Sequence, residues 1–262
     1  MTPYARFPRR RRLRASALLA ALVLPGLGAG CGGSSGPVTL TVLATASMTE
    51  VFGEIAAAYH QDNPGVRLRP VFGGAPELAD RLSEHDPGDV LVTADGASMD
   101  EAAEQLGAPR RTVANGALTI AVAPGNPRRV RGLRDLRRPG LRVVVGAGTV
   151  PVGRYTRQVL RKAGLTVRWS SEEIGARAVL DRIRAGEADA GIVFITDMRS
   201  AGIAASSVPI PADHNVTAAF PAAPIRGGAH EEDAAAFVSW LVTPAAQKLF
   251  NKYGFVTPAA PR

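Results

Sequence analysis

Side chains that could perform covalent or metal chemistry are sparse in this 262-residue chain. Ser47 has no evident base beside it, no Gly-x-Ser-x-Gly elbow occurs, and no Gly-Lys pair marks a phosphate loop. The Gly146-Ala147-Gly148 turn is followed by Pro151 where a dinucleotide fingerprint needs glycine. The histidines lack the spacing of metal ligands: His60, His85, His214 and His230. We therefore expect no enzyme activity, no cofactor and no metal centre.

A second kind of chemistry comes from the backbone. Four junctions between an expected strand and an expected helix carry short loops of small residues, at positions 44–48, 73–77, 146–153 and 174–176. The first N–H groups of a helix have no partner within the helix and carry partial positive charge, so they can bind an anion without a cationic side chain. Ligands of open α/β sheets bind beyond the carboxyl ends of strands. A single loop of this kind is ordinary, whereas several that converge would form an anion site.

The elements that would position these loops alternate along the chain. Apolar runs predict strands at 38–43, 66–71, 90–92, 118–123, 141–145, 190–195 and 204–208. Helical spacing predicts helices at 49–61, 77–83, 99–106, 153–163, 175–185, 231–241 and 244–253. This alternation predicts an α/β protein with parallel sheets and right-handed crossovers.

The first 31 residues have the pattern of an export signal. Six arginines precede the apolar run 17–24, and small residues lead to Cys31, the only cysteine. The run is shorter than the ~20 apolar residues of a membrane-spanning helix. We interpret residues 1–30 as a lipoprotein signal peptide, Cys31 as the acylated residue and 31–37 as a lipidated tether, with the protein anchored to the outside of the cell membrane.

Cleavage of the signal peptide would remove most of the net positive charge of the chain. The full chain carries +8, with 31 basic and 23 acidic residues, and residues 1–30 contain six arginines and no acid. The remaining chain has 31 − 6 = 25 basic residues against 23 acidic ones, or +2. Because the excess of positive charge belongs to the signal, a nucleic-acid partner is not expected.

Several motifs resemble the periplasmic molybdate-binding proteins, the substrate-binding subunits of molybdate ABC importers, in order and spacing. They are LATASMT at 43–49, FGGAPELA at 72–79, PGDVLVTAD at 87–95, NGAL at 115–118, VPVGRY at 150–155, GEADAGIVF at 186–194 and YGF at 253–255. The resemblance covers nearly all of the chain after the signal.

The resemblance implies a two-lobe periplasmic-binding-protein type II fold, each lobe a mostly parallel sheet flanked by helices, with the ligand cleft between them. Lobe I would comprise 38–117 and 210–262, and lobe II 118–209. The cleft would bind molybdate or tungstate for the transmembrane subunits of an ABC permease, and the protein would be a monomer. The implied ligand-binding residues are Ser47, Ala75, Val152, Ala176 and Phe194, of which all but Phe194 contribute backbone N–H groups.

Two positions depart from the family pattern. Ala75-Pro76 replaces a Ser pair, and Phe194 replaces a Tyr, so two hydroxyl donors are missing. Thr45 and Thr196 are candidate replacement donors. Arg177 is expected to be structural, at the hinge or the rim of the cleft, and Arg154 to face solvent; either one inside the cleft would favour a carboxylate or phosphate.

The alternatives keep the same fold. The cleft could bind another oxyanion or a small organic acid, which the missing hydroxyls would suit. A small-carboxylate enzyme would need a positioned base that the sequence does not offer, because Asp89, Asp95 and Asp197 are expected to be structural or capping residues. A sensor lipoprotein is a further alternative. A regulator's effector domain is disfavoured by the export signal and the lack of a helix-turn-helix.

Overall fold

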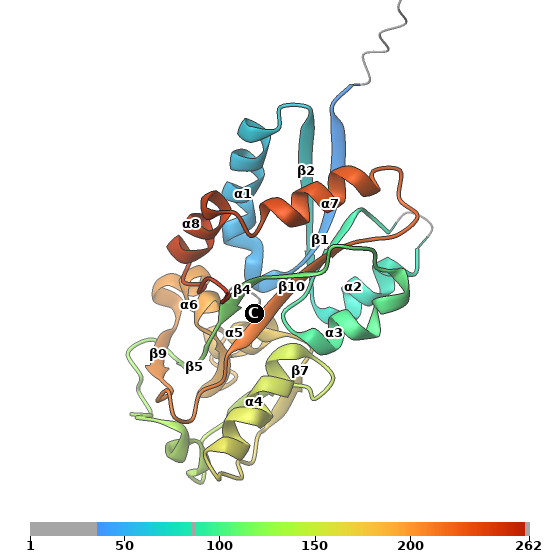
Figure 1. The fold of residues 1–262 in the computed structure, drawn as a ribbon. Helices are drawn as coiled ribbons and strands as arrows, with labels where there is room; N and C mark the ends of the chain where they lie inside the picture. Colours follow the sequence, from blue (N-terminus) through green and yellow to red (C-terminus); the bar gives the residue numbers. More distant parts are fainter. Residues whose placement is uncertain (1–35, 85–86, 260–262) are drawn as a thin grey trace, which may run out of the picture. The chain divides into compact units, whose positions relative to one another are not determined.

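The computed structural model describes residues 36–84 and 87–259. The predicted signal peptide, Cys31 and His85 lie outside the described residues. Within them, the strands form two five-stranded mixed sheets (Figure 1). No helix in the described part of the chain is both long and apolar enough to span a bilayer.

The first sheet has the strand order β2-β1-β3-β10-β4. Its strands are β1 (Val38–Thr45), β2 (Val66–Gly73), β3 (Val90–Val92), β4 (Arg111–Gly116) and β10 (Ala218–Pro224). Strand β10 runs antiparallel to both of its neighbours, so the other four strands share one direction.

Helices cover both faces of this sheet because the side chains of β1 alternate between them. Leu40 and Val42 pack in one apolar cluster with Phe52 of α1 (Thr49–Asp62). The same cluster includes residues of α7 (Glu231–Trp240) and α8 (Pro244–Lys252). Leu43 faces the other way and packs with residues of α2 (Ala75–Leu82) and α3 (Gly96–Glu101).

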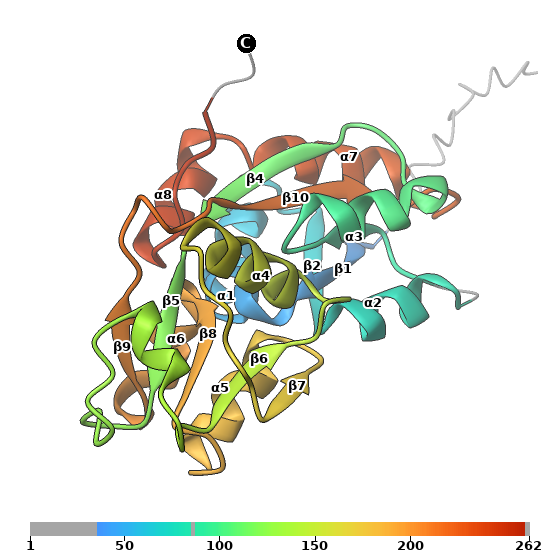
Figure 2. The same cartoon turned by 90° about the horizontal axis from the view of Figure 1, so that it is seen from below.

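The second sheet has the order β7-β6-β8-β5-β9. Its strands are β5 (Leu118–Val122), β6 (Val143–Gly146), β7 (Ser171–Glu173), β8 (Ala190–Phe194) and β9 (Ser206–Pro209). Here β5 is the reversed strand. Its helices are α4 (Pro151–Lys162), α5 (Ala176–Arg184) and α6 (Ile195–Ala201). Val143 and Val145 of β6 pack toward α4, and Val144 packs toward α5, so these helices lie on opposite faces (Figure 2).

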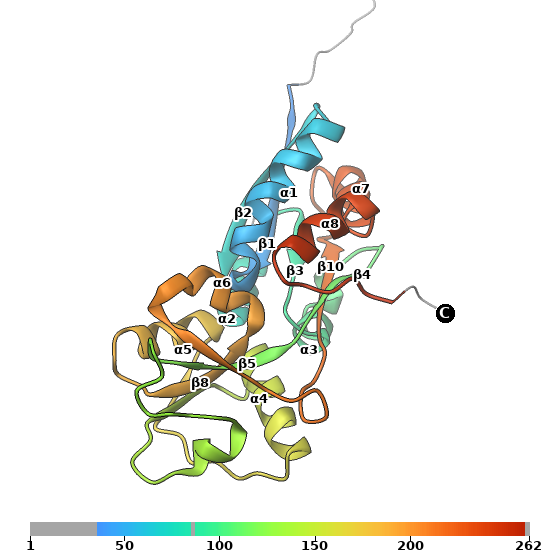
Figure 3. The same ribbon diagram turned by 90° about the vertical axis from the view of Figure 1, so that its left-hand side faces the viewer.

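Two connections join the sheets, and Figure 3 shows them between the two groups of elements. Strand β4 leads through Ala117 into β5, and β9 returns through residues 210–217 to β10. The Asn215 side chain ties the two connections together. Its Oδ1 accepts the Leu118 N–H at 3.2 Å, and its Nδ2 donates to the Leu118 carbonyl at 2.8 Å.

The predicted fold class is confirmed, with three differences in detail. Each sheet contains one reversed strand, so the sheets are mixed and not wholly parallel. The helix predicted at 99–106 begins earlier, at Gly96, because Asp95 caps its start. It is followed by a 3₁₀ turn at Ala103–Gln105. Three strands and one α-helix were not predicted: β4, β7, β10 and α6.

Candidate functional site

A cavity of about 280 Å³ lies where β1, β2 and β8 end and where three helices begin. We call it the donor pocket. It is lined by Thr45–Ser47, Phe72–Ala75, Glu77, Ala94, Val150–Val152, Ile174–Ala178, Asp181 and Phe194. Residues of both sheets contribute to it, as expected for a site at the carboxyl ends of strands.

Helix α2 begins at this pocket, and the backbone N–H groups of Ala75 and Glu77 precede its first helical hydrogen bond. Gly74 precedes the helix, and its N–H donates to Glu77 Oε2 at 2.7 Å. Pro76 has no N–H. The first intrahelical bond of this turn is made by the Leu78 N–H to the Gly74 carbonyl. The Ala75 N–H is therefore a first-turn donor that helix geometry leaves without a partner in its own helix.

Helix α4 begins in the same way, with Val150 before it and Pro151 as its first residue. The Arg154 N–H makes the first bond back to the Val150 carbonyl at 3.0 Å, so the Val152 and Gly153 N–H groups precede the helical ladder. Gly153 lies directly on the preceding loop: a Cβ there would lie 1.8 Å from the Ala147 carbonyl oxygen. This contact explains why glycine is needed in the VPVGRY segment.

Helix α5 supplies the third helix start. Gly175 precedes it in extended backbone, and the Val179 N–H bonds to the Gly175 carbonyl at 3.2 Å, which leaves the Ala176 N–H outside the ladder. The residues before α2, α4 and α5 are Gly74, Val150 and Gly175, and none makes a side-chain cap. By contrast, Asp95 caps α3 by accepting the Ser98 N–H at 2.9 Å. The pocket therefore receives three uncapped positive helix ends.

Ser47 lies in the 3₁₀ turn Ala46–Met48 after β1, and its hydroxyl is hydrogen-bonded to Asp197 of α6. Asp197 Oδ2 also accepts the Phe194 N–H at 2.9 Å and so caps α6. Burial raises the pKa of Asp197 from 3.8 to about 6, against the lowering effects of these two hydrogen bonds and of the Arg177 charge. An ionised Asp197 can only accept a hydrogen bond from the Ser47 hydroxyl. A protonated Asp197 can donate to that hydroxyl instead, which leaves the Ser47 hydrogen for another acceptor.

The ionisable side chains that line the pocket carry no net positive charge. Of the described residues that line it, Glu77 and Asp181 are acidic, and Arg177 is the one with a cationic side chain. Arg177 Nε lies 4.0 Å from Asp181 Oδ1, and the Arg177 side chain is half-exposed. This agrees with the expected place of Arg177 at the rim. Attraction for an anion must therefore come mainly from backbone and hydroxyl donors.

Arg154 was predicted to face solvent, and that prediction was wrong. Its side chain is 21% exposed, and its guanidinium pairs with Asp95, with Nε–Oδ2 at 2.6 Å and Nη2–Oδ1 at 3.1 Å. It also donates to Ser98 Oγ at 2.7 Å and to the Thr149 carbonyl at 2.6 Å. The bidentate carboxylate partner neutralises the guanidinium. Arg154 is also not among the residues that line the donor pocket, and so it does not replace the missing hydroxyls.

The structure places all five predicted ligand-binding residues around the donor pocket: Ser47, Ala75, Val152, Ala176 and Phe194. Thr45 also lines it. Thr196 does not; its hydroxyl is buried without a hydrogen-bond partner within the described structure. Phe194 is buried and packs edge-on against Tyr155 and Phe220.

The sequence reasoning missed the side-chain partners behind the pocket. Glu77 is hydrogen-bonded to the Gly74 N–H, Asp197 is hydrogen-bonded to Ser47, and Asp95 forms an ion pair with Arg154. The spacing Gly74-x-x-Glu77 at a helix start was a usable signal for the first of them. The other two join residues 150 and 59 positions apart, and no local pattern marks such pairs.

Two sheets joined by two crossing connections, with a pocket at the strand ends where three helices begin, are the architecture of a solute-binding protein. The chain belongs to the bacterial extracellular solute-binding protein family, which it matches over residues 40–256. It is 32% identical over 253 residues to the molybdate-binding protein ModA of Mycobacterium tuberculosis, covering 92% of this chain and 97% of that protein. The resemblance to molybdate-binding proteins is thereby confirmed, as is the expected membership of a family of non-enzymatic transport components.

Two further relatives complete the comparison. The chain is 25% identical to the putative ABC transporter substrate-binding lipoprotein YvgL of Bacillus subtilis, covering 92% of this chain and 97% of that protein. The periplasmic molybdate-binding protein of Azotobacter vinelandii has the same fold, with a TM-score of 0.69 and 22% identity over 84% of this chain and 100% of that one.

Proposed function

We propose that this protein captures molybdate or tungstate outside the cytoplasm and delivers it to an ABC permease. The observation that supports this most directly is the convergence of three uncapped helix starts and Ser47 on one pocket of about 280 Å³. The proposal also draws on the ligand named for the Mycobacterium tuberculosis relative.

The dianion would be bound by neutral donors. We assign the N–H groups of Ser47, Ala75, Val152 and Ala176 as donors to the oxyanion oxygens, together with the Ser47 hydroxyl once Asp197 is protonated. Phe194 would form an apolar wall of the site. Hydrogen bonds to charged groups contribute about 1.5–3 kcal/mol each. Discrimination against sulfate would come from the spacing of the donors, because both ions are tetrahedral dianions.

We further propose that residues 38–117 with 210–262, and residues 118–209, act as two lobes. Ser47 and Ala75 belong to the first, and Val152, Ala176 and Phe194 to the second. An anion between them would hold the lobes together, because it would bond to donors from both. The closed form would be the one that the permease recognises.

We propose that Cys31 carries a lipid anchor and that the protein works as a monomer at the membrane surface. The sequence pattern of residues 1–37 and the lipoprotein named among the relatives support the anchor. Mass spectrometry of the membrane-extracted protein would show a diacylglyceryl mass on a peptide that begins at Cys31, and cleavage elsewhere without added lipid would exclude the anchor.

Calorimetric titration of the purified protein with molybdate, tungstate, sulfate and phosphate tests the ligand. We expect sub-micromolar binding of molybdate or tungstate and no heat with sulfate. No heat and no thermal stabilisation with molybdate or tungstate would refute the proposal.

A further inference from the structure

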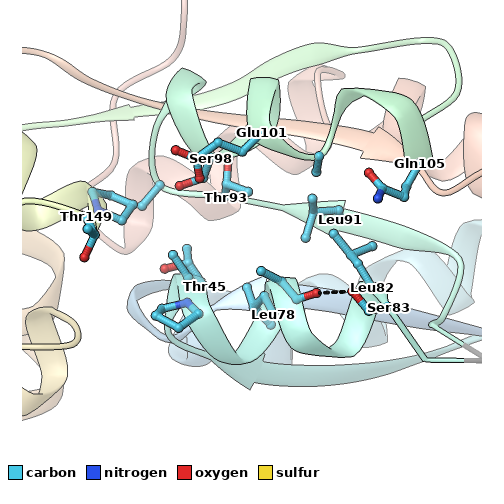
Figure 4. A pocket seen from close by; sticks show the side chains of 16 residues that line it. Thr45, Leu78, Leu82, Ser83, Leu91, Thr93, Ser98, Glu101, Gln105 and Thr149 are labelled. Carbon is cyan, nitrogen blue, oxygen red and sulfur yellow. Dashed lines mark hydrogen bonds between the residues drawn. The ribbon is translucent and has the colours of Figure 1, made fainter.

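A second cavity of about 340 Å³ opens beside the donor pocket, between α2 and α3 (Figure 4). We call it the α2–α3 groove. Thr45 and Thr149 lie at one end of it, Leu91 near the middle, and Ser83 and Gln105 at the other end. Its apolar lining consists of Ala75, Pro76, Leu78, Ala79, Leu82, Leu91, Ala94, Ala102 and Pro151.

Several polar atoms along the groove are hydrogen-bonded within the protein. Thr93 Oγ1 donates to the Asp95 carbonyl at 2.7 Å, and Ser83 Oγ donates to the Ala79 carbonyl at 3.3 Å. Ser98 Oγ accepts the Arg154 guanidinium. Of the described lining residues none is cationic, and Glu101 is the one acid, 3.7 Å from Arg154. The groove is therefore unsuited to an anionic group and presents an apolar surface to an uncharged chain.

The groove and the donor pocket are continuous. They share Thr45, Ala75, Ala94 and Pro151 as lining residues. At this junction the first two residues of α2 offer one N–H between them, that of Ala75, because Pro76 has none. The Thr45 hydroxyl is the one side-chain donor among the four shared residues. A ligand bound in the donor pocket therefore meets few donors at this corner, where the pocket opens onto the mostly apolar groove.

From this arrangement we infer that the cleft also binds organic oxyanions of the type R–PO₃, with the three oxygens in the donor pocket and a short uncharged hydrocarbon tail R in the α2–α3 groove. The inference rests on the proposed anion site for the head group and goes beyond it in the class of ligand. A tetrahedral head with one carbon substituent matches a pocket whose donors come from Ser47 and three helix starts and whose opening toward the groove is mostly apolar.

A series of n-alkylphosphonates from methyl to hexyl tests this inference. Each is titrated calorimetrically into the purified protein, and each is also tested for displacement of bound molybdate. Burying one methylene strengthens binding by a factor of about four at most, so we expect about two- to four-fold per carbon until the tail exceeds the groove. Displacement shows that the head group occupies the molybdate site.

The variant Ala79→Phe fills the groove from α2. Ala79 is exposed, lines the groove and does not line the donor pocket, so the fold and the molybdate site should be unaffected. We expect Ala79→Phe to bind molybdate and methylphosphonate as the wild type does, but to lose the gain with chain length. Ala57→Phe, on an exposed position of α1, is the matched control and should retain that gain.

Affinity that stays flat with chain length, absence of phosphonate binding, or an equal loss at all lengths in Ala79→Phe would each overturn the inference while molybdate still binds. Absence of molybdate binding would refute the proposed function instead. A chain-length gain abolished by Ala79→Phe and kept by Ala57→Phe would establish the groove as a tail site.

Discussion

Arg154 and Asp95 form a bidentate ion pair between helices that belong to different sheets. Asp95 stands at the start of α3 on the first sheet, and Arg154 lies in the first turns of α4 on the second. The neighbouring Tyr155 hydroxyl accepts the Ala219 N–H of β10 at 3.1 Å, which adds a second link between α4 and the first sheet. Beside the donor pocket, α4 of the second sheet therefore contacts the first sheet through charged and polar groups.

Removing the charge of Asp95 should weaken this link without uncapping α3. Asn can still accept the Ser98 N–H, so Asp95→Asn isolates the ion pair. Because Arg154 retains some exposure, we expect a loss of about 1–2 kcal/mol in the free energy of unfolding, measured in urea. In a double-mutant cycle with Arg154→Met the two losses should not add; full additivity would mean that the pair contributes nothing.

Molybdate affinity should rise as pH falls from 7.5 to 5.5. Asp197, with a pKa raised to about 6 by burial, gains a proton in this range and frees the Ser47 hydroxyl to donate to the anion. We expect about a tenfold gain in affinity, the size of one charge-assisted hydrogen bond. Calorimetry across this range checks it. Asp197→Asn should bind with the higher affinity at every pH, since its amide can donate to Ser47; a pH profile identical to the wild type would contradict the assignment.

The same proton should affect stability. Because the pKa of Asp197 is higher in the folded protein than its ordinary 3.8, the folded state holds the proton that the unfolded state releases between about pH 4 and pH 6. The contribution of this group therefore decreases as pH rises through that window. Urea unfolding at a series of pH values should show a slope that Asp197→Asn removes. An unchanged slope in that variant would assign the effect to other groups.

Ser47→Ala should reduce molybdate affinity more at low pH than at high pH. At pH 7.5 the hydroxyl donates to ionised Asp197, so its removal should change molybdate affinity little. At pH 5.5 we expect about a tenfold loss of molybdate affinity. Titration of both proteins at the two pH values measures the difference. Ser239→Ala, on an exposed face of α7, is the control and should change neither value.

Gly153→Ala should disrupt the start of α4. Its Cβ would lie 1.8 Å from the Ala147 carbonyl oxygen, so the helix start must move and carry the Val152 N–H with it. We expect a destabilisation of at least about 2 kcal/mol in urea unfolding and a clear loss of molybdate affinity. At Gly148, in the same loop, the nearest atom to an added Cβ is Arg157 Cζ at 3.4 Å, so Gly148→Ala should be tolerated. Equal effects of the two substitutions would show that the close contact between Gly153 and the Ala147 carbonyl is not the cause of the destabilisation.

Sequence patterns predicted most helices and the apolar strands of this fold, because their period is set by burial on one or two faces. The missed elements lack such a period. Strand β10 contains Pro221 and Pro224, and Pro221 sits at an irregularity in the pairing with β4, where a missing N–H is tolerated. Strand β7 is three polar residues at a sheet edge, and α6 follows β8 with no loop between them.

The five predicted site residues lie at one pocket because strand ends and helix starts are features of the local sequence. The side chains that hydrogen-bond to these residues are not determined by the local sequence. Which residues meet Arg154 or Ser47 depends on the order of strands in two sheets, and that order is not encoded in any single segment. Arg154 was therefore placed in solvent, although its neighbour in space is a nearly buried carboxylate.

Strand β10 has a consequence for how the chain completes its fold. In the first sheet β10 lies between β3 and β4, and it is the last strand in the sequence. Until it arrives, β4 has no neighbouring strand in its own sheet, whereas residues 118–209 already contain every strand of the second sheet. As the chain emerges from the export channel, the second sheet can therefore assemble first, and a chain cut after β9 would keep that sheet while leaving the first one divided.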